Sequence, residues 1–236
     1  MKRQAEAELM DGEDQARAYA QADFSEPHGH FIELLAGACQ DMSGTGMALD
    51  LGCGAGDISV RFARAFETWT VHGLDGSRAM LRYGYEAVIK AGLESRVVLA
   101  KSYLPEGEAP AESYDLVFSN SLLHHLPQAQ TLWQAIKRWA APAAEVFVMD
   151  LLRPRDTAQA RKLVQDQVGY EPEILQRDFH NSLLAAYSID EVEEQLLQAE
   201  LSHLQIKQVS DRHLTVSGRL METTATAGIT LKERYR

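Results

Sequence analysis

The stretch Ala48–Asp57, "ALDLGCGAGD", decides the fold. A hydrophobic run ends at Asp50, and three glycines follow at alternate positions: Gly52, Gly54 and Gly56. Glycines spaced in this way after a strand are typical of backbone that passes close to a ligand. The stretch therefore predicts a binding loop at the end of a buried strand, with a carboxylate where the strand ends.

Strand-like and helical patterns alternate on both sides of this loop. The strand-like segments are residues 47–52, 69–75, 96–100, 114–120 and 144–152, and the helical ones are residues 57–67, 77–93 and 129–140. This alternation predicts an α/β fold, with a parallel sheet covered by helices on both faces. The glycine loop then lies at the carboxyl end of the sheet, where open α/β sheets bind ligands.

The two ends of the chain differ from this central part. Residues 1–24 are rich in Ala, Gln and Glu and predict a helix, "SEPHGHF" interrupts it at residues 25–31, and a second helix follows to residue 42. Near the other end, residues 189–201 predict an amphipathic helix, and two strand-like segments at 204–210 and 212–218 are separated by little more than Asp211. Strands joined so tightly must be antiparallel. We therefore expect a parallel sheet with an antiparallel edge.

Composition restricts the class of partner. The chain of 236 residues is 45% hydrophobic, and its 23 Lys and Arg against 34 Asp and Glu give a net charge of −11. This balance disfavours nucleic acid, which needs a basic face. No apolar run approaches a membrane span and no secretory signal opens the sequence, so a cytoplasmic location is expected. Cys39 and Cys53 are too few for a disulfide framework, and no metal site is predicted because no ligand spacing supports one.

The charges around the loop indicate which ligand it holds. The dinucleotide pattern G-x-G-x-x-G fits in neither register, because its last glycine would fall on Asp57 or on Ser59. A pyrophosphate here would also meet the like charges of Asp50 and Asp57. A cationic ligand is favoured instead, and S-adenosylmethionine (SAM) carries an ammonium group and a sulfonium but no phosphate.

A second acidic residue, Asp75, ends the next strand in "VHGLD". A carboxylate about twenty residues beyond the loop suits a ribose diol, because it accepts both hydroxyl hydrogens. NAD and SAM both contain that ribose, so the loop charges, rather than Asp75, favour SAM.

Three segments, "LDLGCGAGD", "GLDGSRAML" and "YDLVFSNSLLHHL", resemble motifs I, II and IV of the class I SAM-dependent methyltransferases. The similarity is to the small-molecule branch of that family, the type 11/25-like methyltransferases. It runs from about residue 47 to residue 152 and continues more weakly to residue 218. It implies a single Rossmann-like domain with a seven-stranded, mostly parallel sheet, an antiparallel last strand and an N-terminal helical cap.

The resemblance also implies a set of SAM-binding residues, with S-adenosylhomocysteine as the product. One group would hold the methionine end: Asp50, Gly52, Cys53, Gly54 and Gly56. Asp75 would hold the ribose, with Gly76, Ser77, Ser102 and Tyr103 near the adenine. The family often has an acidic residue after the third strand, and here Lys101 or Ser102 fills that position, depending on the alignment. Asn120 and Ser121 would lie beneath the transferring methyl group, and Tyr19 on the N-terminal helix would contact the SAM carboxylate.

The expected layout is a helical cap (1–45), a SAM-binding core (46–152), an acceptor-site cap (153–187), the last helix and antiparallel strands (188–218) and a tail (219–236). The segment 153–187 is longer than a plain crossover, and extra chain at this edge of a sheet is typical of a substrate cap. It supplies our candidate acceptor contacts, Arg153, Asn181 and Tyr187, and a candidate base, His180. His125, in "HHL", is either a second base or a residue that only shapes the turn.

The leading functional hypothesis is a methyltransferase that transfers the SAM methyl group to a small molecule. The alternatives are a SAM-binding adapter without catalysis, and a protein or RNA methyltransferase. An NAD-dependent oxidoreductase is disfavoured by the loop charges. DNA-type amino methylation is disfavoured because "SNSLL" replaces the N-P-P-Y-like turn. The sequence does not specify the acceptor.

Overall fold

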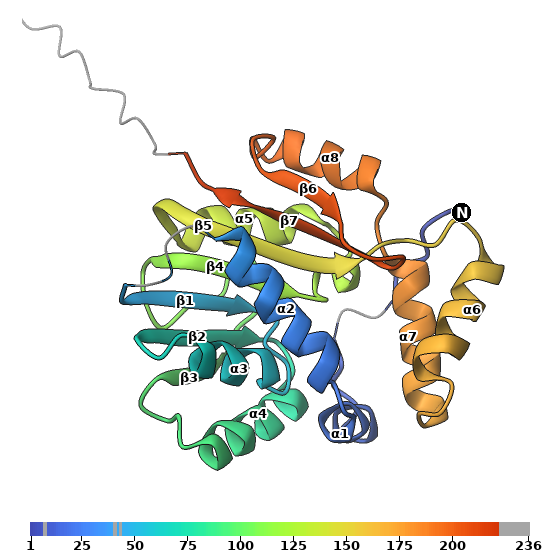
Figure 1. Cartoon of the computed structure of the whole chain (residues 1–236), viewed down its shortest axis with the longest axis horizontal. Coiled ribbons are helices and arrows are strands. Elements are labelled where there is room, and N and C mark those ends of the chain that lie inside the picture. The colour runs from blue at the N-terminus through green and yellow to red at the C-terminus, as the bar shows by residue number, and fades with distance from the viewer. Residues whose placement is uncertain (7–8, 40–41, 43, 222–236) are drawn as a thin grey trace, which may run out of the picture.

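The structure is a computed structural model, and it describes residues 1–6, 9–39, 42 and 44–221 (Figure 1). The strands are β1 (Gly46–Leu51), β2 (Trp69–Asp75), β3 (Val97–Lys101), β4 (Tyr114–Asn120), β5 (Ala140–Leu151), β6 (Gln205–Gln208) and β7 (His213–Arg219). The helices are α1 (Glu13–Gln21), α2 (Ser25–Ala38), α3 (Asp57–Ala65), α4 (Arg78–Ala91), α5 (Gln130–Trp139), α6 (Thr157–Val168), α7 (Glu173–Ala185) and α8 (Ile189–Gln198), with a short 3₁₀ helix η1 (Leu123–His125).

The seven strands form one sheet in the order β3-β2-β1-β4-β5-β7-β6. Strands β1 to β5 pair in parallel, and β7 lies antiparallel between β5 and β6. The expected mostly parallel sheet with an antiparallel last strand is therefore confirmed. The strand order reverses between β1 and β4, and such a switch point opens a crevice at the carboxyl ends of the strands.

Helices cover both faces of the sheet (Figure 1). On one face, α2, α3 and α4 bury apolar side chains against the strands, including Phe31, Phe62 and Val88. On the other face, α5 and α8 supply a second core with Trp133 and Leu196. Among the described residues, no helix has the length and apolar character needed to cross a membrane.

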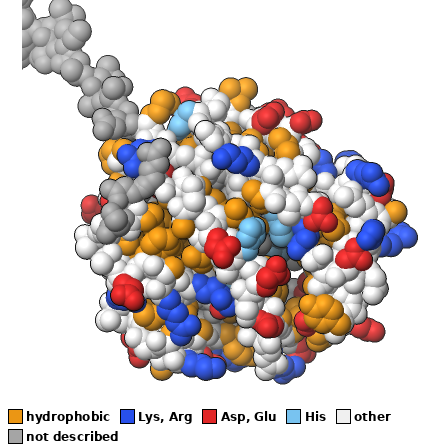
Figure 2. All heavy atoms as spheres, viewed as in Figure 1, with side chains coloured by type: hydrophobic (Ala, Val, Ile, Leu, Met, Phe, Trp, Pro, Cys, Tyr) orange, Lys and Arg blue, Asp and Glu red, His pale blue; other side chains and the backbone are white. Residues whose placement is uncertain are grey.

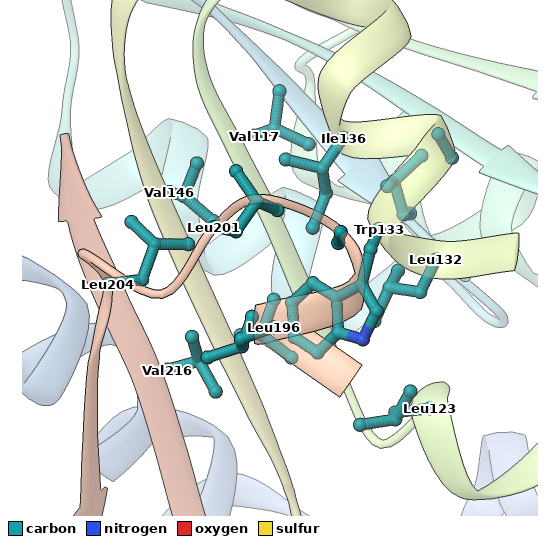
Figure 3. Close-up of a cluster of buried hydrophobic side chains, with 14 of the residues drawn as sticks. Val117, Leu123, Leu132, Trp133, Ile136, Val146, Leu196, Leu201, Leu204 and Val216 are labelled. Atoms are coloured by element: carbon teal, nitrogen blue, oxygen red, sulfur yellow. The ribbon is translucent and has the colours of Figure 1, made fainter. Parts of the chain in front are cut away.

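The second core shows how a large side chain is accommodated. Trp133 is fully buried, and Ile136, Leu196, Leu201 and Val216 lie around it (Figure 3). Its indole Nε1 donates a hydrogen bond to Gln195 on α8, at 3.2 Å, so the one polar atom of the ring is satisfied. Trp133 is therefore a core residue.

The N-terminal prediction was wrong in two places. Residues 1–24 do not form one helix, because α1 begins only at Glu13 and the described residues before it form no helix. The interruption at residues 25–31 is also absent, since α2 begins at Ser25 and continues through Pro27 and Gly29. Pro27 lies in the first turn, where its missing N–H has no helical acceptor to lose.

Chain between β5 and α8 forms the helical pair α6 and α7, which packs beside the sheet through a small core of Leu151, Leu163, Leu183 and Ala186 (Figure 1). The pair stands next to the crevice rather than on a face of the sheet. Most of the expected tail lies outside the described residues, which end at residue 221.

Candidate functional site

A cavity of about 1430 Å³ opens at the carboxyl ends of β1, β2 and β4. Its walls also include the N-terminal segment, α1, the start of α2, η1 and α7. On the face shown in Figure 2, acidic and histidine side chains surround a hollow. Pockets for one drug-sized ligand measure roughly 300–1,000 Å³, so this cavity has room for a cofactor together with a second molecule.

The glycine loop has a backbone conformation that is unfavourable for residues with a side chain. Gly52, Gly54 and Gly56 have φ angles of 76°, 52° and 75°, in the left-handed region. A Cβ on Gly52 would lie 2.9 Å from Leu122, which is too close. The amides of Gly52 and Cys53 donate to the carbonyl of Leu74 at the end of β2. The loop is therefore fixed against β2, and its backbone faces the cavity.

Asp75 connects the loop to α4. Its Oδ2 accepts the amide of Gly54 at 2.8 Å, and its Oδ1 accepts the amide of Ser77 at 2.7 Å. Each oxygen keeps a second lone pair for a ligand, because a carboxylate offers about four acceptor sites. Burial raises the pKa of Asp75, and the two amide bonds oppose that rise. The carboxylate is thus rigidly placed at the cavity wall, as a ribose-binding group requires.

The residues expected near the adenine divide into two groups. Gly76, Ser102 and Tyr103 line the cavity, and a Cβ on Gly76 would come within 3.1 Å of the Tyr103 ring. Ser77 is not among the described lining residues. Its hydroxyl instead caps α4 by accepting the Met80 amide and donates to the Met10 carbonyl. Ser77 therefore positions the loop after β2 rather than contacting a ligand.

Ser102 gives a direct test of whether SAM fits. Its Oγ is buried and makes no hydrogen bond with any residue that the structure describes. A buried hydroxyl without a partner is destabilising unless a ligand or water supplies one. The adenine amino group of SAM would be such a partner, and the glycine loop and Asp75 offer the methionine and ribose contacts. The residues present therefore fit SAM.

Asp50 is buried at the end of β1, with 1% of its surface exposed. Ser59 on α3 donates a hydrogen bond to its Oδ2 at 2.5 Å. Burial raises the pKa of Asp50 to about 7, the Ser59 bond lowers it, and the nearby charge of Asp75 raises it further. A cationic ligand beside Asp50 would lower that pKa, because it favours the ionised carboxylate.

SAM binding is therefore expected to strengthen as the pH rises from 5.5 to 7.5. A bound cation favours ionised Asp50, so below its pKa of about 7 binding must release a proton. The dissociation constant should fall by at most about 30-fold across this range. Asp50→Asn, which still accepts the Ser59 bond, should give a flatter profile by calorimetry at several pH values. Parallel profiles for the two proteins would contradict this role for Asp50.

The sequence analysis treated Asp57 as a negative charge that the ligand would meet, but its carboxylate instead bonds two basic side chains of the protein. Its Oδ2 lies 2.7 Å from Nδ1 of His28 on α2 and 2.6 Å from Nε of Arg61. Burial raises the pKa of Asp57, but these two hydrogen bonds more than offset it and hold the pKa below its usual value. Asp57 therefore joins α2 to α3, and the uncompensated carboxylates of the loop region are Asp50 and Asp75.

Three more of the expected SAM contacts lie at the cavity wall: Tyr19, Asn120 and Ser121. Tyr19 comes from α1, which folds over the loop region. Burial, with smaller contributions from Asp57, Asp75 and Asp50, raises its pKa to about 12, so its hydroxyl stays protonated and can donate. Ser121 has a φ of 56°, which turns the chain at the end of β4 toward the cavity.

A polar corner of the cavity is made by Glu6, His124 and His125. His124 Nε2 and His125 Nδ1 lie 3.6 and 3.3 Å from Glu6 Oε1. Behind them, His124 Nδ1 lies 2.7 Å from Oδ1 of Asp150, a residue buried at the end of β5. Burial alone would lower the pKa of His124, but the charge and hydrogen bond of Asp150 raise it overall. Burial raises the pKa of Glu6.

The acceptor contacts expected from residues 153–187 are only partly where we placed them. Asn181 lines the cavity, together with Arg177, Asp178, Phe179 and Ser182. His180, Arg153 and Tyr187 are not among the described lining residues. Arg153 pairs with Glu191 at 2.8 Å, and the Tyr187 hydroxyl donates to the Leu126 carbonyl while Arg3 packs over its ring. Arg153 and Tyr187 therefore hold the fold together.

The sequence analysis missed Glu6 and Asp150. Glu6 lies in a segment expected to be helical, with nothing to associate it with the histidines. Asp150 carried a signal, since it ends a strand just as Asp50 and Asp75 do. The carboxyl ends of parallel strands meet at one edge of a sheet, so Asp150 could have been placed near the site.

Comparison with known proteins agrees with this geometry. Residues 48–143 match the model of a family described as a methyltransferase domain. A relative from Amycolatopsis mediterranei, 27-O-demethylrifamycin SV methyltransferase, is 27% identical over 163 residues. That match covers 69% of this chain but 56% of the relative, so the chain spans little more than half of that protein.

Solved structures show the same fold at lower identity. A SAM-dependent methyltransferase from Aquifex aeolicus is 20% identical, with a TM-score of 0.65 over 89% of this chain and 99% of that one. Phosphoethanolamine N-methyltransferase 2 from Haemonchus contortus, in complex with SAM, is also 20% identical, with a TM-score of 0.63 over 84% of this chain and 44% of that one. The family match over residues 48–143 and the shared fold support the resemblance seen in the sequence, that of a class I SAM-dependent methyltransferase with SAM as the cofactor.

Proposed function

We propose that this chain transfers the methyl group of SAM to a small organic acceptor that binds between the sheet edge and α7. The observation that carries the proposal is the single cavity wall shared by two sets of residues. One set, around Asp50 and Asp75, fits SAM. The other set, which includes Glu6 and Asn181, lines the remaining part of the cavity, where a second molecule could bind. The Amycolatopsis relative is named for a small-molecule substrate, which supports an acceptor of that kind.

Bound SAM would supply an electrophilic methyl carbon: the acceptor's nucleophile forms the new bond, the carbon–sulfur electron pair stays on sulfur as S-adenosylhomocysteine, and the proton of the acceptor's O–H or N–H group is released to solvent. The residues of this chain bind and orient the two molecules. Alignment alone is worth effective molarities on the order of 10⁵ M or more. We infer that Asp75 and the glycine loop hold the cofactor, and that α1 and α7 close the cavity.

A contact between the two caps supports such closure. Gln15 on α1 donates its side-chain amide to Asp178 on α7 at 2.7 Å. Since both residues line the cavity, this bond connects the helix over the cofactor half to the helix over the acceptor half. It restricts the access of water and favours an acceptor small enough to be enclosed.

The direct test is methyl transfer to a panel of small alcohols, phenols and amines. We expect release of S-adenosylhomocysteine and a mass gain of one CH₂ in at least one acceptor, detected by mass spectrometry. Calorimetry should show that SAM and S-adenosylhomocysteine bind and that NAD does not. SAM binding without transfer to any small molecule, protein or RNA would instead support the non-catalytic adapter.

Two adjacent residues of α7 test the acceptor wall. Asn181→Ala should reduce kcat/KM for the acceptor about 10-fold, the scale of one lost hydrogen bond, and leave SAM affinity within a factor of about three. His180→Ala is the matched control and should change neither quantity, because His180 is not among the described residues that line the cavity. A large loss in His180→Ala with none in Asn181→Ala would contradict this orientation of α7.

A further inference from the structure

The polar corner of Glu6, His124 and His125 has the geometry of a metal site. One ligand atom from each residue lies within 4.8 Å of the other two. Both imidazole nitrogens are 3.3–3.6 Å from the same carboxylate oxygen, which is longer than the roughly 2.7–2.9 Å of a charge-assisted hydrogen bond. Ligands of a tetrahedral zinc ion stand about 3.4 Å apart, since each lies ~2.0–2.1 Å from the metal.

Asp150 orients His124 as a ligand. It accepts the amides of Leu123 and Leu151 as well as His124 Nδ1, each at 2.7 Å, so it acts as an acceptor throughout. His124 Nδ1 therefore carries a hydrogen, which leaves Nε2, 3.6 Å from Glu6 Oε1, as the ring nitrogen that a metal ion could take. Metal-binding histidines almost always have such a partner on the second nitrogen, because it fixes the tautomer and the ring.

Glu6 is brought to the histidines by long-range bonds of the N-terminal segment. The amide of Gln4 donates to the Leu184 carbonyl at 2.9 Å, and Arg3 donates to the carbonyls of Ala185 and His124. Ser182 hydrogen-bonds the Glu6 carboxylate, but the buried Oε1 atom has no hydrogen-bond partner among the described residues. A buried carboxylate oxygen in this state is costly, and a cation between it and the imidazoles would remove the cost.

The surrounding charges allow a cation. Besides Glu6, the carboxylates of Asp150 and Asp178 lie near the corner; Arg3 opposes them, and Arg177 pairs with Asp178 at 2.9 Å. The Arg3 guanidinium donates to the carbonyls of His124 and Leu126 and packs on the Tyr187 ring, so these contacts already engage it. All three candidate ligands line the cavity, and Asp150, which holds His124, lies on β5, three strands along the sheet from Asp75 on β2.

We propose that Glu6, His124 and His125 bind one divalent transition-metal ion, best matched by Zn²⁺, in the acceptor half of the cavity. Two imidazoles and one carboxylate leave the fourth tetrahedral position open, as in catalytic zinc sites. Because all three residues line the cavity, the open position would be accessible to a hydroxyl oxygen of the acceptor. The substrate class is therefore an alcohol or phenol, an assignment that rests on the proposed function.

The first experiment measures metal binding without any acceptor. Protein freed of affinity tags and of metal is titrated with Zn²⁺ against a chromophoric chelator, and zinc retained after gel filtration is counted by mass spectrometry. We expect one zinc per chain, with a dissociation constant below micromolar. Absence of stoichiometric zinc at micromolar concentrations would overturn the site and leave the corner as a hydrogen-bonding cluster.

Variants then assign the ligands. Glu6→Gln keeps the shape of the side chain but loses its charge, and His125→Gln removes one imidazole. Each should weaken zinc binding about 100-fold or more. Loss of a residue that only hydrogen-bonds a ligand costs about 10- to 100-fold, and loss of a ligand itself should cost at least as much. The controls are Glu33→Gln and His203→Ala, a glutamate and an exposed histidine outside the corner, and neither should change the affinity. Equal zinc binding in Glu6→Gln and in the wild-type protein would overturn the assignment.

Two further measurements separate this proposal from the proposed function. A thermal melt in a chelator shows whether each variant folds, and SAM calorimetry reports the cofactor half independently. If SAM binds and methyl transfer occurs but zinc does not bind, the metal site is wrong and the methyltransferase stands. If zinc binds through Glu6 but SAM does not bind, the proposed function fails while the metal site is retained.

Discussion

Replacing Asp75 by alanine is expected to weaken SAM binding about 100-fold or more. Two charge-assisted hydrogen bonds to the ribose would be lost, each worth roughly 1.5–3 kcal/mol. The structure adds a second loss, because Asp75 also accepts the amides of Gly54 and Ser77. Without it, the glycine loop and the start of α4 would both lose an anchor. The dissociation constant is measured by calorimetry.

The matched control is Asp115→Ala. Asp115 also accepts a backbone amide, that of Met47 at 2.9 Å, but it is exposed and stands near the beginning of β4, at the opposite edge of the sheet from the cavity. Its loss should leave SAM affinity unchanged. Melting temperatures of both variants would show whether any weakening comes from unfolding. A folded Asp75→Ala variant with SAM affinity within a factor of three of wild type would refute the ribose assignment.

The cofactor half of the site could be predicted because its residues are local in sequence. Asp50 and Asp75 each end a strand, and Asn120 ends another. In a parallel sheet these ends meet at one edge, so the sequence places the side chains together without any knowledge of long-range packing. The glycine spacing between Gly52 and Gly56 likewise reports local backbone geometry, and the structure shows all three glycines in the left-handed region.

The acceptor half could not be predicted in the same way. Glu6 reaches the histidines because residues 3 and 4 bond to the end of α7, about 180 positions away in the sequence. Such bonds leave no periodic pattern in the chain. The Ala and Glu content of the N-terminal segment favours helix, yet these tertiary contacts override that weak preference.

The absence of His180 from the described cavity wall has a geometric reason. Cavity-lining residues of α7 include Leu175, Asp178 and Ser182, which repeat at the three- and four-residue spacing of one helix face. His180, two positions from Asp178, falls roughly on the opposite face because each residue turns the helix by about 100°. Its chemistry made it attractive, but position on the helix decides which side chains reach the cavity.

Replacing Asp150 by alanine is expected to reduce the free energy of unfolding by about 3–5 kcal/mol, the range for removing one member of a buried ion pair. Asp150 is 2% exposed and accepts from Leu123, Leu151 and His124. Alanine offers no acceptor, so two buried amides and an imidazole would lose their partner at once. Urea unfolding in the presence of a chelator measures the change without any contribution from bound metal.

Glu145→Ala is the control for this large effect. Glu145 is also a buried carboxylate on β5, but it pairs only with the half-exposed side chain of Arg219 among the described residues. Its replacement should reduce stability by about 1 kcal/mol or less, as exposed ion pairs do. If the two alanine variants were equally stable, the donors around Asp150 would not need it, and the orientation of His124 would need another explanation.

Asp150→Asn distinguishes loss of shape from loss of charge. Asparagine fills the same volume and can still accept one or two of the three hydrogen bonds, but its NH₂ group must face at least one N–H donor. We therefore expect a stability between those of wild type and Asp150→Ala. Because the same carboxylate holds η1 and the imidazole of His124, this variant should also weaken zinc binding about 10- to 100-fold while leaving the Asp75 subsite intact. A stability loss without any change in zinc affinity would show that Asp150 supports the fold alone.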